Sequence, residues 1–368
     1  MSEPLLFVSA GDPSGDIAVS LVVSALREKT PGLKTFGLGG ARLKQLGQEQ
    51  LAEPSDLAVL GFWEVARRYL YFLQLFNKCV REIERRRPTA IVLVDYPGFN
   101  LRLAKKIRPF GIPIIYYISP QVWAWGKGRL PQLRTLVDRL LVILPFEETF
   151  YRQHDVPSRF VGHYLLEDIP AEYISSSSPG KKQLALLPGS RRQEVERMLP
   201  PMLEAAARLY DTHGMTSVVA ALTGTFDYEG ACRPYSSRGV TVVYDDPRRV
   251  IFESDLVLTS SGTATLETGI IGRPMVVVYK TGALTYLIAR RLVKLDRIAL
   301  VNLVLADKTV PELIQGEATP DHMAVEVERF LNDDTYRRNV IRALQRVPSL
   351  LGGRGASTRA AEAIREYL

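Results

Sequence analysis

The feature that most constrains the fold of this chain is a repeated unit: a short apolar run, a turn rich in glycine, proline or serine, and then an amphipathic segment. The runs Leu5–Ala10 and Ala90–Asp95 are mainly apolar and lack the alternation of a half-exposed strand. Such runs are typical of strands in a parallel sheet that is covered on both faces. Because helix-like segments such as Ile17–Glu28 follow them, the sequence predicts an α/β fold with doubly wound parallel sheets.

The repeated unit occurs in two series. In the first series, further strands are expected at Ile112–Ile118 and Leu140–Leu144, and further helices at Phe62–Arg86, Leu101–Ile107 and Arg129–Val137. In the second series, strands are expected at Leu184–Leu187, Ser217–Leu222, Val240–Tyr244, Asp255–Thr259 and Met275–Tyr279, and helices at Glu194–Tyr210, Ala264–Ile271 and Leu284–Lys294. A chain of 368 residues also exceeds the size, roughly 250–300 residues, at which one core stops growing. We therefore expect two Rossmann-like domains that face an interdomain cleft, where such folds bind ligands.

Changes in the pattern place the domain boundaries. We expect an N-terminal domain at 1–170, a linker at 171–182, a second domain at 183–345 and a C-terminal helical segment at 346–368. The linker contains the four serines Ser175–Ser178, as flexible connections often do. The C-terminal segment has a helical pattern interrupted at Pro348 and at Gly352. We expect it either to cross back onto the first domain or to reach another subunit.

Composition narrows the partners. Apolar residues make up 46% of the chain and charged residues 24%, which is an ordinary globular balance. The net charge of +7 favours anionic partners such as phosphates or anionic lipid. No RNA-binding signature or zinc-knuckle spacing is present, so no nucleic acid partner is expected. The four histidines do not cluster, and neither a metal nor a cofactor is expected.

Two further features bear on location. Cys79 and Cys232 are far apart in the sequence, which favours a reduced, cytoplasmic compartment over a disulfide framework. No apolar run reaches about 18 residues, so we expect any membrane contact to be peripheral.

The first candidate site is the loop after the first strand, which contains Gly11, Asp12, Ser14, Gly15 and Asp16. Glycines allow a close approach of the backbone to a ligand, and a following helix start favours an anion or sugar hydroxyls. The alternative is an ordinary turn in which Ser14 or Asp16 caps the helix. No Walker lysine and no complete G-x-G-x-x-G motif are present, so neither a kinase nor a dehydrogenase is indicated.

Asp95 ends a later apolar strand, followed by the segment Tyr96–Asn100. A carboxylate at the end of a parallel strand is well placed to take a proton from a sugar hydroxyl. By position alone, Asp95 could equally well be the cap of the following helix.

Two loops of the second half suit a diphosphate. Gly189, Ser190 and Arg191 open one helix, and a second loop offers Ser261, Gly262 and Thr263, followed by Glu267 as an acceptor for ribose hydroxyls. Small residues, hydroxyls and an arginine at a helix start favour bound phosphate. The alternative is that these residues only cap their helices.

Aromatic residues gather in two places. The loop Ser119–Gly126 carries Trp123 and Trp125, which could stack on a sugar, meet an acyl chain or belong to the core. The first half of the expected helix 62–86 contains Phe62, Trp63, Tyr69, Phe72 and Phe76, with Arg67 and Arg68 between Trp63 and Tyr69. Such a segment could lie on an anionic bilayer or line an acyl-chain groove, or it could be a buried helix.

Taken together, these motifs resemble one known family, the lipid-A-disaccharide synthases. The matching segments, in the order of that family, are Ala10–Asp16, Asp95 with Phe99-Asn100, Ser119 with Trp123–Trp125, Leu144–Glu147, Gly162-His163, Leu187–Arg191, Ser261–Thr263 with Glu267, and Leu300–Leu303. They extend over nearly the whole chain, so the combination is specific although each piece alone is not.

The resemblance implies an inverting glycosyltransferase of the GT-B type that needs no metal. Its donor would be UDP-2,3-diacylglucosamine and its acceptor 2,3-diacylglucosamine 1-phosphate, and the products would be UDP and the β-1,6-linked lipid A disaccharide 1-phosphate. The enzyme would work at the inner face of the cytoplasmic membrane, and family members can be dimers that exchange C-terminal segments. The alternative is another GT-B enzyme acting on a UDP-amino-sugar, a peptidoglycan glycosyltransferase or an epimerase.

By position, the resemblance assigns Asp95 as the general base and places Arg191, Ser261–Thr263, Glu267 and Asn302 at UDP. The loop from Gly11 to Asp16 falls on the acceptor side, and Phe62–Phe76 in the region of membrane or acyl contact. Two departures stand out: Asp12 where the family commonly has glutamate, and Gly98 where it commonly has aspartate.

Overall fold

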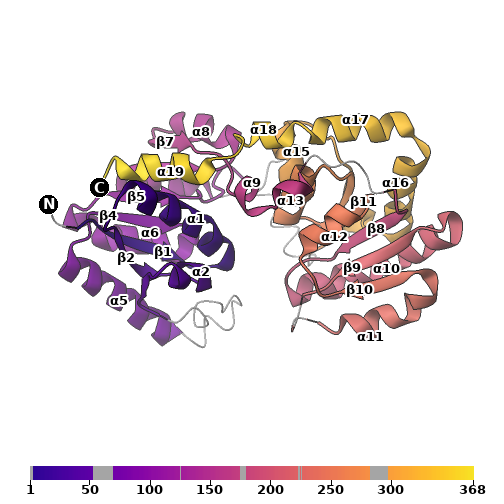
Figure 1. Ribbon diagram of the computed structural model, residues 1–368, viewed down its shortest axis with the longest axis horizontal. Helices are drawn as coiled ribbons and strands as arrows, with labels where there is room; N and C mark the ends of the chain where they lie inside the picture. The colour runs from indigo at the N-terminus through magenta and orange to yellow at the C-terminus, as the bar shows by residue number, and fades with distance from the viewer. Residues whose placement is uncertain are drawn as a thin grey trace. The chain divides into compact units, whose positions relative to one another are not determined.

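The computed structural model describes residues 3–52, 69–124, 126–174, 180–222, 224, 226–281 and 297–368 (Figure 1). The chain divides into two compact units. The first contains Met1–Asp168 together with Leu351–Leu368, and the second contains Ile169–Leu350. Each unit has its own sheet, and both sheets are parallel in every described pair of strands.

The first unit is built on seven strands in the order β3-β2-β1-β4-β5-β6-β7. Its strands are β1 (Leu5–Ala10), β2 (Lys34–Leu38), β3 (Glu49–Gln50), β4 (Ala90–Val94), β5 (Ile114–Tyr117), β6 (Arg139–Val142) and β7 (Ser158–Phe160). Its helices are α1 (Pro13–Lys29), α2 (Ala41–Gln45), α5 (Tyr69–Arg86), α6 (Pro97–Ile107), α7 (Leu130–Leu136), α8 (Pro145–Arg152), α9 (Leu165–Asp168) and α19 (Ala356–Arg365). Several helices start with proline, whose missing N–H costs nothing in the first turn.

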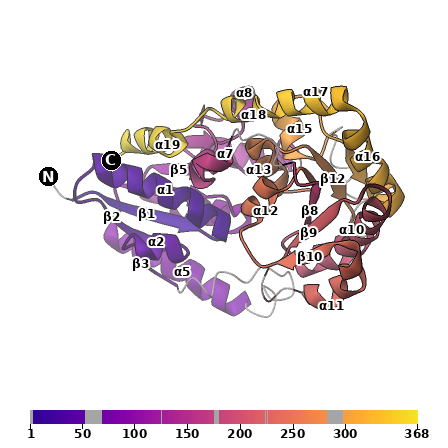
Figure 2. The same ribbon diagram turned by 45° about the vertical axis from the view of Figure 1, so that its right-hand side comes forward.

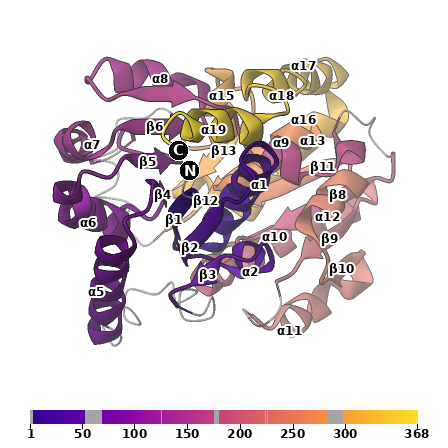
Figure 3. The same cartoon turned by 60° about the vertical axis from the view of Figure 1, so that its left-hand side comes forward.

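Helices α5, α6 and α7 cover one face of this sheet, and α1 and α19 lie on the other (Figure 3). On α5, Leu75, Cys79 and Ile83 recur every four residues and are buried in the core beneath the sheet. This spacing forms one apolar stripe along a helix. The strands are buried on both faces, which explains why their sequences show no alternation.

The C-terminal segment crosses back onto the first unit. Figure 1 shows α19, in yellow, beside the indigo helix α1, and Lys29 on α1 forms a 2.6 Å ion pair with Glu362 on α19. At the start of α19, the main-chain N–H of Ser357 donates to Glu167 at 3.0 Å. These contacts hold residues far apart in the sequence within one core.

The second unit has six strands in the order β10-β9-β8-β11-β12-β13. Its strands are β8 (Gln183–Leu187), β9 (Thr216–Ala220), β10 (Val240–Val243), β11 (Leu256–Ser260), β12 (Met275–Tyr279) and β13 (Glu312–Ile314). Its helices are α10 (Arg192–His213), α11 (Tyr228–Cys232), α12 (Pro247–Glu253), α13 (Thr263–Ile271), α15 (Leu300–Leu305), α16 (Pro320–Asn332), α17 (Asp334–Leu344) and α18 (Val347–Leu350). Helices α10 and α16 pack together on one side of this sheet, and α12 and α13 on the other (Figure 2).

In each sheet the strand order reverses at one topological switch point. It lies between β1 and β4 in the first unit, and between β8 and β11 in the second. The register pairs Ala10 with Val94 and Leu187 with Thr259 at these points. The loops that follow the paired strands therefore leave the sheet side by side. In open α/β sheets, ligands bind outside the carboxyl ends of the strands at such switch points.

The predicted α/β class and doubly wound sheets are confirmed. The expected strands at Leu5–Ala10 and Met275–Tyr279 match to the residue. The expected helix Leu284–Lys294 and the first part of the expected helix Phe62–Arg86 lie outside the described residues. Pro348 does not interrupt a helix, because it occupies the first turn of α18.

Candidate active site

The backbone turns sharply at Asp95, directly after β4. Asp95 and Tyr96 both have left-handed φ angles, +43° and +45°, which side chains other than glycine adopt at a cost. The amide of Asn100 donates to the carbonyl of Asp95 at 2.8 Å and to that of Val94 at 3.0 Å, and Ser9 on β1 donates to the Asn100 side chain at 2.7 Å. These bonds hold the strained turn in place. Tyr96 is the N-cap residue of α6, so Asp95 is not its cap.

The Asp95 carboxyl is half-buried, and its environment favours the protonated form. Burial, reinforced by the negative charge of Asp12, raises the pKa of Asp95 from 3.8 to about 6. A carboxylate with a pKa just below neutral is mostly ionised at pH 7 and still basic enough to accept a proton. The switch point of the first unit thus holds a group suited to general base catalysis.

The loop after β1 lies against this turn. A Cβ on Gly11 would come within 2.5 Å of the Tyr96 ring, so glycine is needed for this close approach. The hydroxyl of Ser14 donates to Asp12, whose second oxygen is buried without a hydrogen-bond partner among the described residues. Asp12 is therefore close enough to Asp95 for its charge to act on that carboxyl, and Ser14 is bonded to Asp12, while Gly15 is buried in the first turn of α1.

Asp16 has a different task from its neighbours in this loop. It is buried, and its carboxylate accepts main-chain hydrogen bonds from Gly40 at 2.8 Å, Arg42 at 3.0 Å and Leu43 at 3.2 Å. It therefore anchors the first turn of α2 and does not cap α1, which has no side-chain cap. This arrangement makes Asp16 a positioning residue of the loop.

An apolar pocket of about 340 Å³ opens beside Tyr96. Its lining residues come from α5 and from α6 with its N-cap residue: Phe72, Leu73, Phe76, Tyr96, Gly98, Phe99 and Arg102. Phe72 and Phe76 were predicted for membrane or acyl contact. Phe62 and Trp63 lie outside the described residues, as does the side chain of Tyr69.

The tryptophan loop after β5 is fixed by a buried acid. Glu147, in the first turn of α8, accepts hydrogen bonds from Ser119 at 2.6 Å and from the Trp123 indole at 2.9 Å. Burial raises the pKa of Glu147 against these opposing bonds. The Trp123 ring also packs edge-on against Phe146. Trp125 lies outside the described residues.

A second pocket, of about 230 Å³, lies at the switch point of the second unit. Its lining includes six residues predicted for the donor: Gly189, Ser190, Ser261, Gly262, Thr263 and Glu267. The starts of α10 and α13 lie at this pocket, so their main-chain N–H groups favour a bound anion. Ser190 does not cap α10, because Arg191 is the N-cap residue.

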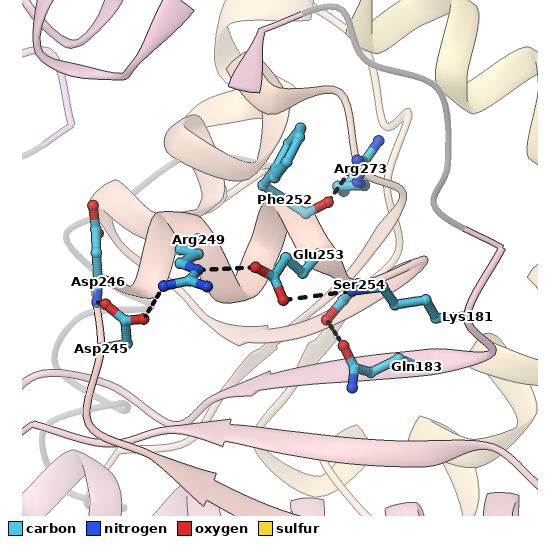
Figure 4. A network of polar contacts seen from close by, with 9 residues as sticks. All are labelled: Lys181, Gln183, Asp245, Asp246, Arg249, Phe252, Glu253, Ser254 and Arg273. Atoms are coloured by element: carbon cyan, nitrogen blue, oxygen red, sulfur yellow. Dashed lines mark hydrogen bonds and ion pairs between the residues drawn. The ribbon is translucent and has the colours of Figure 1, made fainter. Parts of the chain in front are cut away.

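Glu267 is held by an arginine that the sequence analysis did not single out. Arg248 donates to Glu267 at 2.8 Å, and both side chains are only 16% exposed. Arg248 belongs to α12, which further polar contacts fix to its surroundings (Figure 4). Among these, Lys181 pairs with Glu253 at 3.5 Å, and Arg273 donates to the main-chain carbonyl of Phe252 at 2.7 Å.

The remaining two predicted donor residues do not line the pocket. Arg191 follows the lining residue Ser190. Its side chain is 72% exposed and pairs with Glu194 at 3.4 Å. Asn302 is fully buried: it donates to Val310 at 2.9 Å and to Glu312 at 2.7 Å, and accepts from the N–H groups of Thr309 and Val310. These bonds occupy the Asn302 amide, so its direct contact with UDP stays a prediction.

Sequence reasoning missed Arg248, Arg102 and Tyr116. Tyr116 lies inside an apolar strand, and no local signal shows that its hydroxyl reaches the carbonyl of Asp95 at 2.6 Å. Arg248 follows a proline at a helix start, a pattern typical of a solvated residue. In the described part of the chain, no group of three or more histidine, cysteine or acidic side chains could hold a metal ion, and no helix is long and apolar enough to cross a membrane.

By its two Rossmann-like units the protein belongs to the GT-B fold class, which solved glycosyltransferases and epimerases share. The fold is similar to that of a solved calicheamicin glycosyltransferase (TM-score 0.62, 16% identity, covering 100% of this chain and 99% of that one). It is also similar to a UDP-GlcNAc 2-epimerase from Neisseria meningitidis bound to UDP-GlcNAc (TM-score 0.65, 11% identity, covering 98% and 99%). At these identities the likeness concerns the fold alone.

Sequence comparison defines the family within this class. The profile of the family described as Lipid-A-disaccharide synthetase matches residues 6–364. The lipid-A-disaccharide synthase of Myxococcus xanthus is 41% identical over 374 residues, covering 99% of this chain and 98% of the relative. The chain therefore belongs to the lipid-A-disaccharide synthase family. It is an enzyme, a glycosyltransferase of lipid A biosynthesis, as the sequence motifs predicted.

Proposed function

We propose that the enzyme transfers 2,3-diacylglucosamine from UDP to the 6-hydroxyl of 2,3-diacylglucosamine 1-phosphate. The products are the β-1,6-linked disaccharide 1-phosphate and UDP. In this proposal the first unit is the acceptor domain and the second unit is the donor domain. The observation that carries it is the half-buried Asp95 at the first switch point, with a pKa raised to about 6.

Asp95 acts as the general base. Its carboxylate takes the proton of the acceptor 6-hydroxyl while that oxygen forms a bond to the anomeric carbon of the donor. The bond between the anomeric carbon and the UDP oxygen breaks, and its electron pair leaves with UDP. One displacement of this kind inverts the anomeric centre. General base catalysis typically contributes about 10²–10⁴-fold in rate.

The donor pocket stabilises the departing nucleotide. Main-chain N–H groups at the starts of α10 and α13 face the diphosphate, with Arg191 at the edge of the pocket. Glu267, oriented by Arg248, accepts hydrogen bonds from the ribose hydroxyls. Asn302 remains a proposed contact of UDP, and its side chain also accepts hydrogen bonds from the N–H groups of Thr309 and Val310.

Mass spectrometry of the products tests this function. The enzyme is incubated with the two acylated glucosamine substrates, and the expected result is the tetraacyl disaccharide 1-phosphate with an equal amount of UDP. UDP-N-acetylglucosamine serves as the alternative donor. If UDP-N-acetylglucosamine is epimerised, or is transferred as fast as the acylated donor, the protein is instead the alternative GT-B enzyme that acts on a UDP-amino-sugar.

We also propose peripheral contact with the inner face of the cytoplasmic membrane. Support comes from α5, where Leu70 is 70% exposed and Leu73 is 43% exposed. Arg67 and Arg68 directly precede α5 in the sequence, and apolar side chains next to basic ones favour binding to an anionic bilayer. Co-sedimentation with anionic vesicles should therefore be lost in the double variant L70E/L73E, while the wild type binds.

A homodimer that exchanges C-terminal segments is compatible with the contact between α1 and α19. In an exchanged dimer, α19 of each chain would occupy the same position on α1 of the other. Sedimentation velocity over a range of concentrations tests this. A single species at the monomer mass would exclude the dimer.

A further inference from the structure

A row of aromatic rings connects the Asp95 turn with the apolar pocket in the first unit. Tyr96, the residue after Asp95, stacks on Phe99 with 6.0 Å between ring centroids. Phe99 in turn packs edge-on against Phe76 at 5.7 Å. All three line the pocket, whose volume of about 340 Å³ falls in the usual range for small-ligand sites, roughly 300–1,000 Å³. An apolar chain in this pocket would begin beside the proposed base.

The pocket also carries one cation. Arg102 is exposed, lines the pocket and forms no ion pair or hydrogen bond within the described residues. It lies on α6 five residues after Pro97, which corresponds to about 7.5 Å along the helix axis. This separation is comparable with the length of one hexose ring. Gly98, one turn before Arg102, leaves open space on that face of the helix.

We propose that Arg102 binds the phosphate of the acceptor lipid while one of its acyl chains occupies the pocket lined by Phe72, Phe76 and Phe99. Arg102 is then a specificity-determining residue that selects phosphorylated acceptors. The inference rests on the proposed function, and it adds the group that recognises the acceptor anion.

Charge and position favour this occupant over a membrane phospholipid. A phosphomonoester carries close to two negative charges at neutral pH and accepts the paired N–H donors of a guanidinium. The phosphate and the acyl chain belong to one molecule, so binding at Arg102 and in the pocket fixes its sugar ring next to Tyr96 and Asp95. A bilayer phospholipid would satisfy Arg102 without orienting any hydroxyl at Asp95.

Steady-state kinetics in neutral detergent micelles test the proposal. R102Q is compared with the wild type on the acylated acceptor with and without its 1-phosphate. We expect R102Q to raise KM for the phosphorylated acceptor about tenfold or more, the scale of one lost charge-assisted hydrogen bond. The KM for the dephosphorylated acceptor and the KM for the donor should stay unchanged, and kcat should change less than about threefold. R102K should restore part of the loss.

K106Q is the matched control, because Lys106 lies one turn further along α6 and does not line the pocket. Its KM values should equal those of the wild type. An equal loss with both acceptors in R102Q would overturn the proposal, as would a loss seen only in binding to anionic vesicles. If the wild type forms no disaccharide from either acceptor, the proposed function fails instead, which is a different result.

Discussion

The hydroxyl of Tyr116 donates a 2.6 Å hydrogen bond to the main-chain carbonyl of Asp95, across the boundary between β5 and the turn after β4. The bond joins a buried tyrosine to a residue with a left-handed backbone. Strained conformations of this kind persist only where the surrounding structure fixes them. Tyr116 is therefore a positioning residue for the proposed base.

Y116F tests this relationship. The variant loses one hydrogen bond, so we expect the free energy of unfolding to fall by about 1 kcal/mol. The kcat should fall several-fold, while KM for both substrates stays within about twofold of the wild type. Thermal denaturation and steady-state kinetics measure the two effects. A loss of stability without any loss of kcat would show that Tyr116 serves only the fold.

The pH dependence of kcat/KM should report on Asp95. A general base works in its ionised form, so the rate should fall as the pH drops through about 6, the raised pKa of Asp95. The D12N variant removes the negative charge that contributes to this shift, so its acidic limb should move to lower pH. An acidic limb at the same pH in D12N would mean that Asp12 has no influence on the base.

Asp95 should also reduce the stability of the protein at neutral pH. Folding raises the pKa of Asp95 from 3.8 to about 6, so the destabilisation is absent below about pH 4, grows between about pH 4 and 6, and is constant at higher pH. D95N removes that charge. At pH 7 we expect it to unfold at higher denaturant concentration, with a gain of up to about 3 kcal/mol. Equal stability of D95N and wild type at pH 7 would contradict the burial of the charge.

The donor pocket can be tested through Glu267. E267Q should weaken binding of the UDP-sugar about tenfold, because the neutral amide is a weaker acceptor for ribose hydroxyls and its bond to Arg248 is no longer an ion pair. Isothermal titration with UDP measures the change. E253Q is the control: Glu253 also pairs with an arginine, Arg249, but does not line the pocket. If E267Q binds UDP as tightly as E253Q does, Glu267 is not a ribose ligand.

The elements that were predicted best are those whose own residues show a clear pattern, such as a continuous apolar run. The strand Met275–Tyr279 is a continuous apolar run and was predicted to the residue. The short edge strands β3 (Glu49–Gln50) and β13 (Glu312–Ile314) were missed, because they contain charged residues and owe their conformation to pairing with a neighbour. Tertiary pairing of this kind leaves little trace in local composition.

The same limit applies to the site. Loops that follow strands could be recognised from their small residues, and six of the predicted donor residues do line one pocket. The partners that orient them could not be recognised, because Arg248 reaches Glu267 from another helix and Glu147 reaches Ser119 from a later one. The role of Asp16 could not be predicted either, because its carboxylate is buried and accepts hydrogen bonds from three main-chain N–H groups of a later segment.

The most direct test of the proposed chemistry is a single-turnover measurement of sugar transfer by D95N at pH 7.5, with both substrates bound at saturation. Asparagine keeps the shape of the side chain but cannot accept the proton. We expect the rate to fall by about 10²–10⁴-fold, with UDP binding and folding intact. A rate within about threefold of the wild type would show that another group takes the proton of the acceptor hydroxyl.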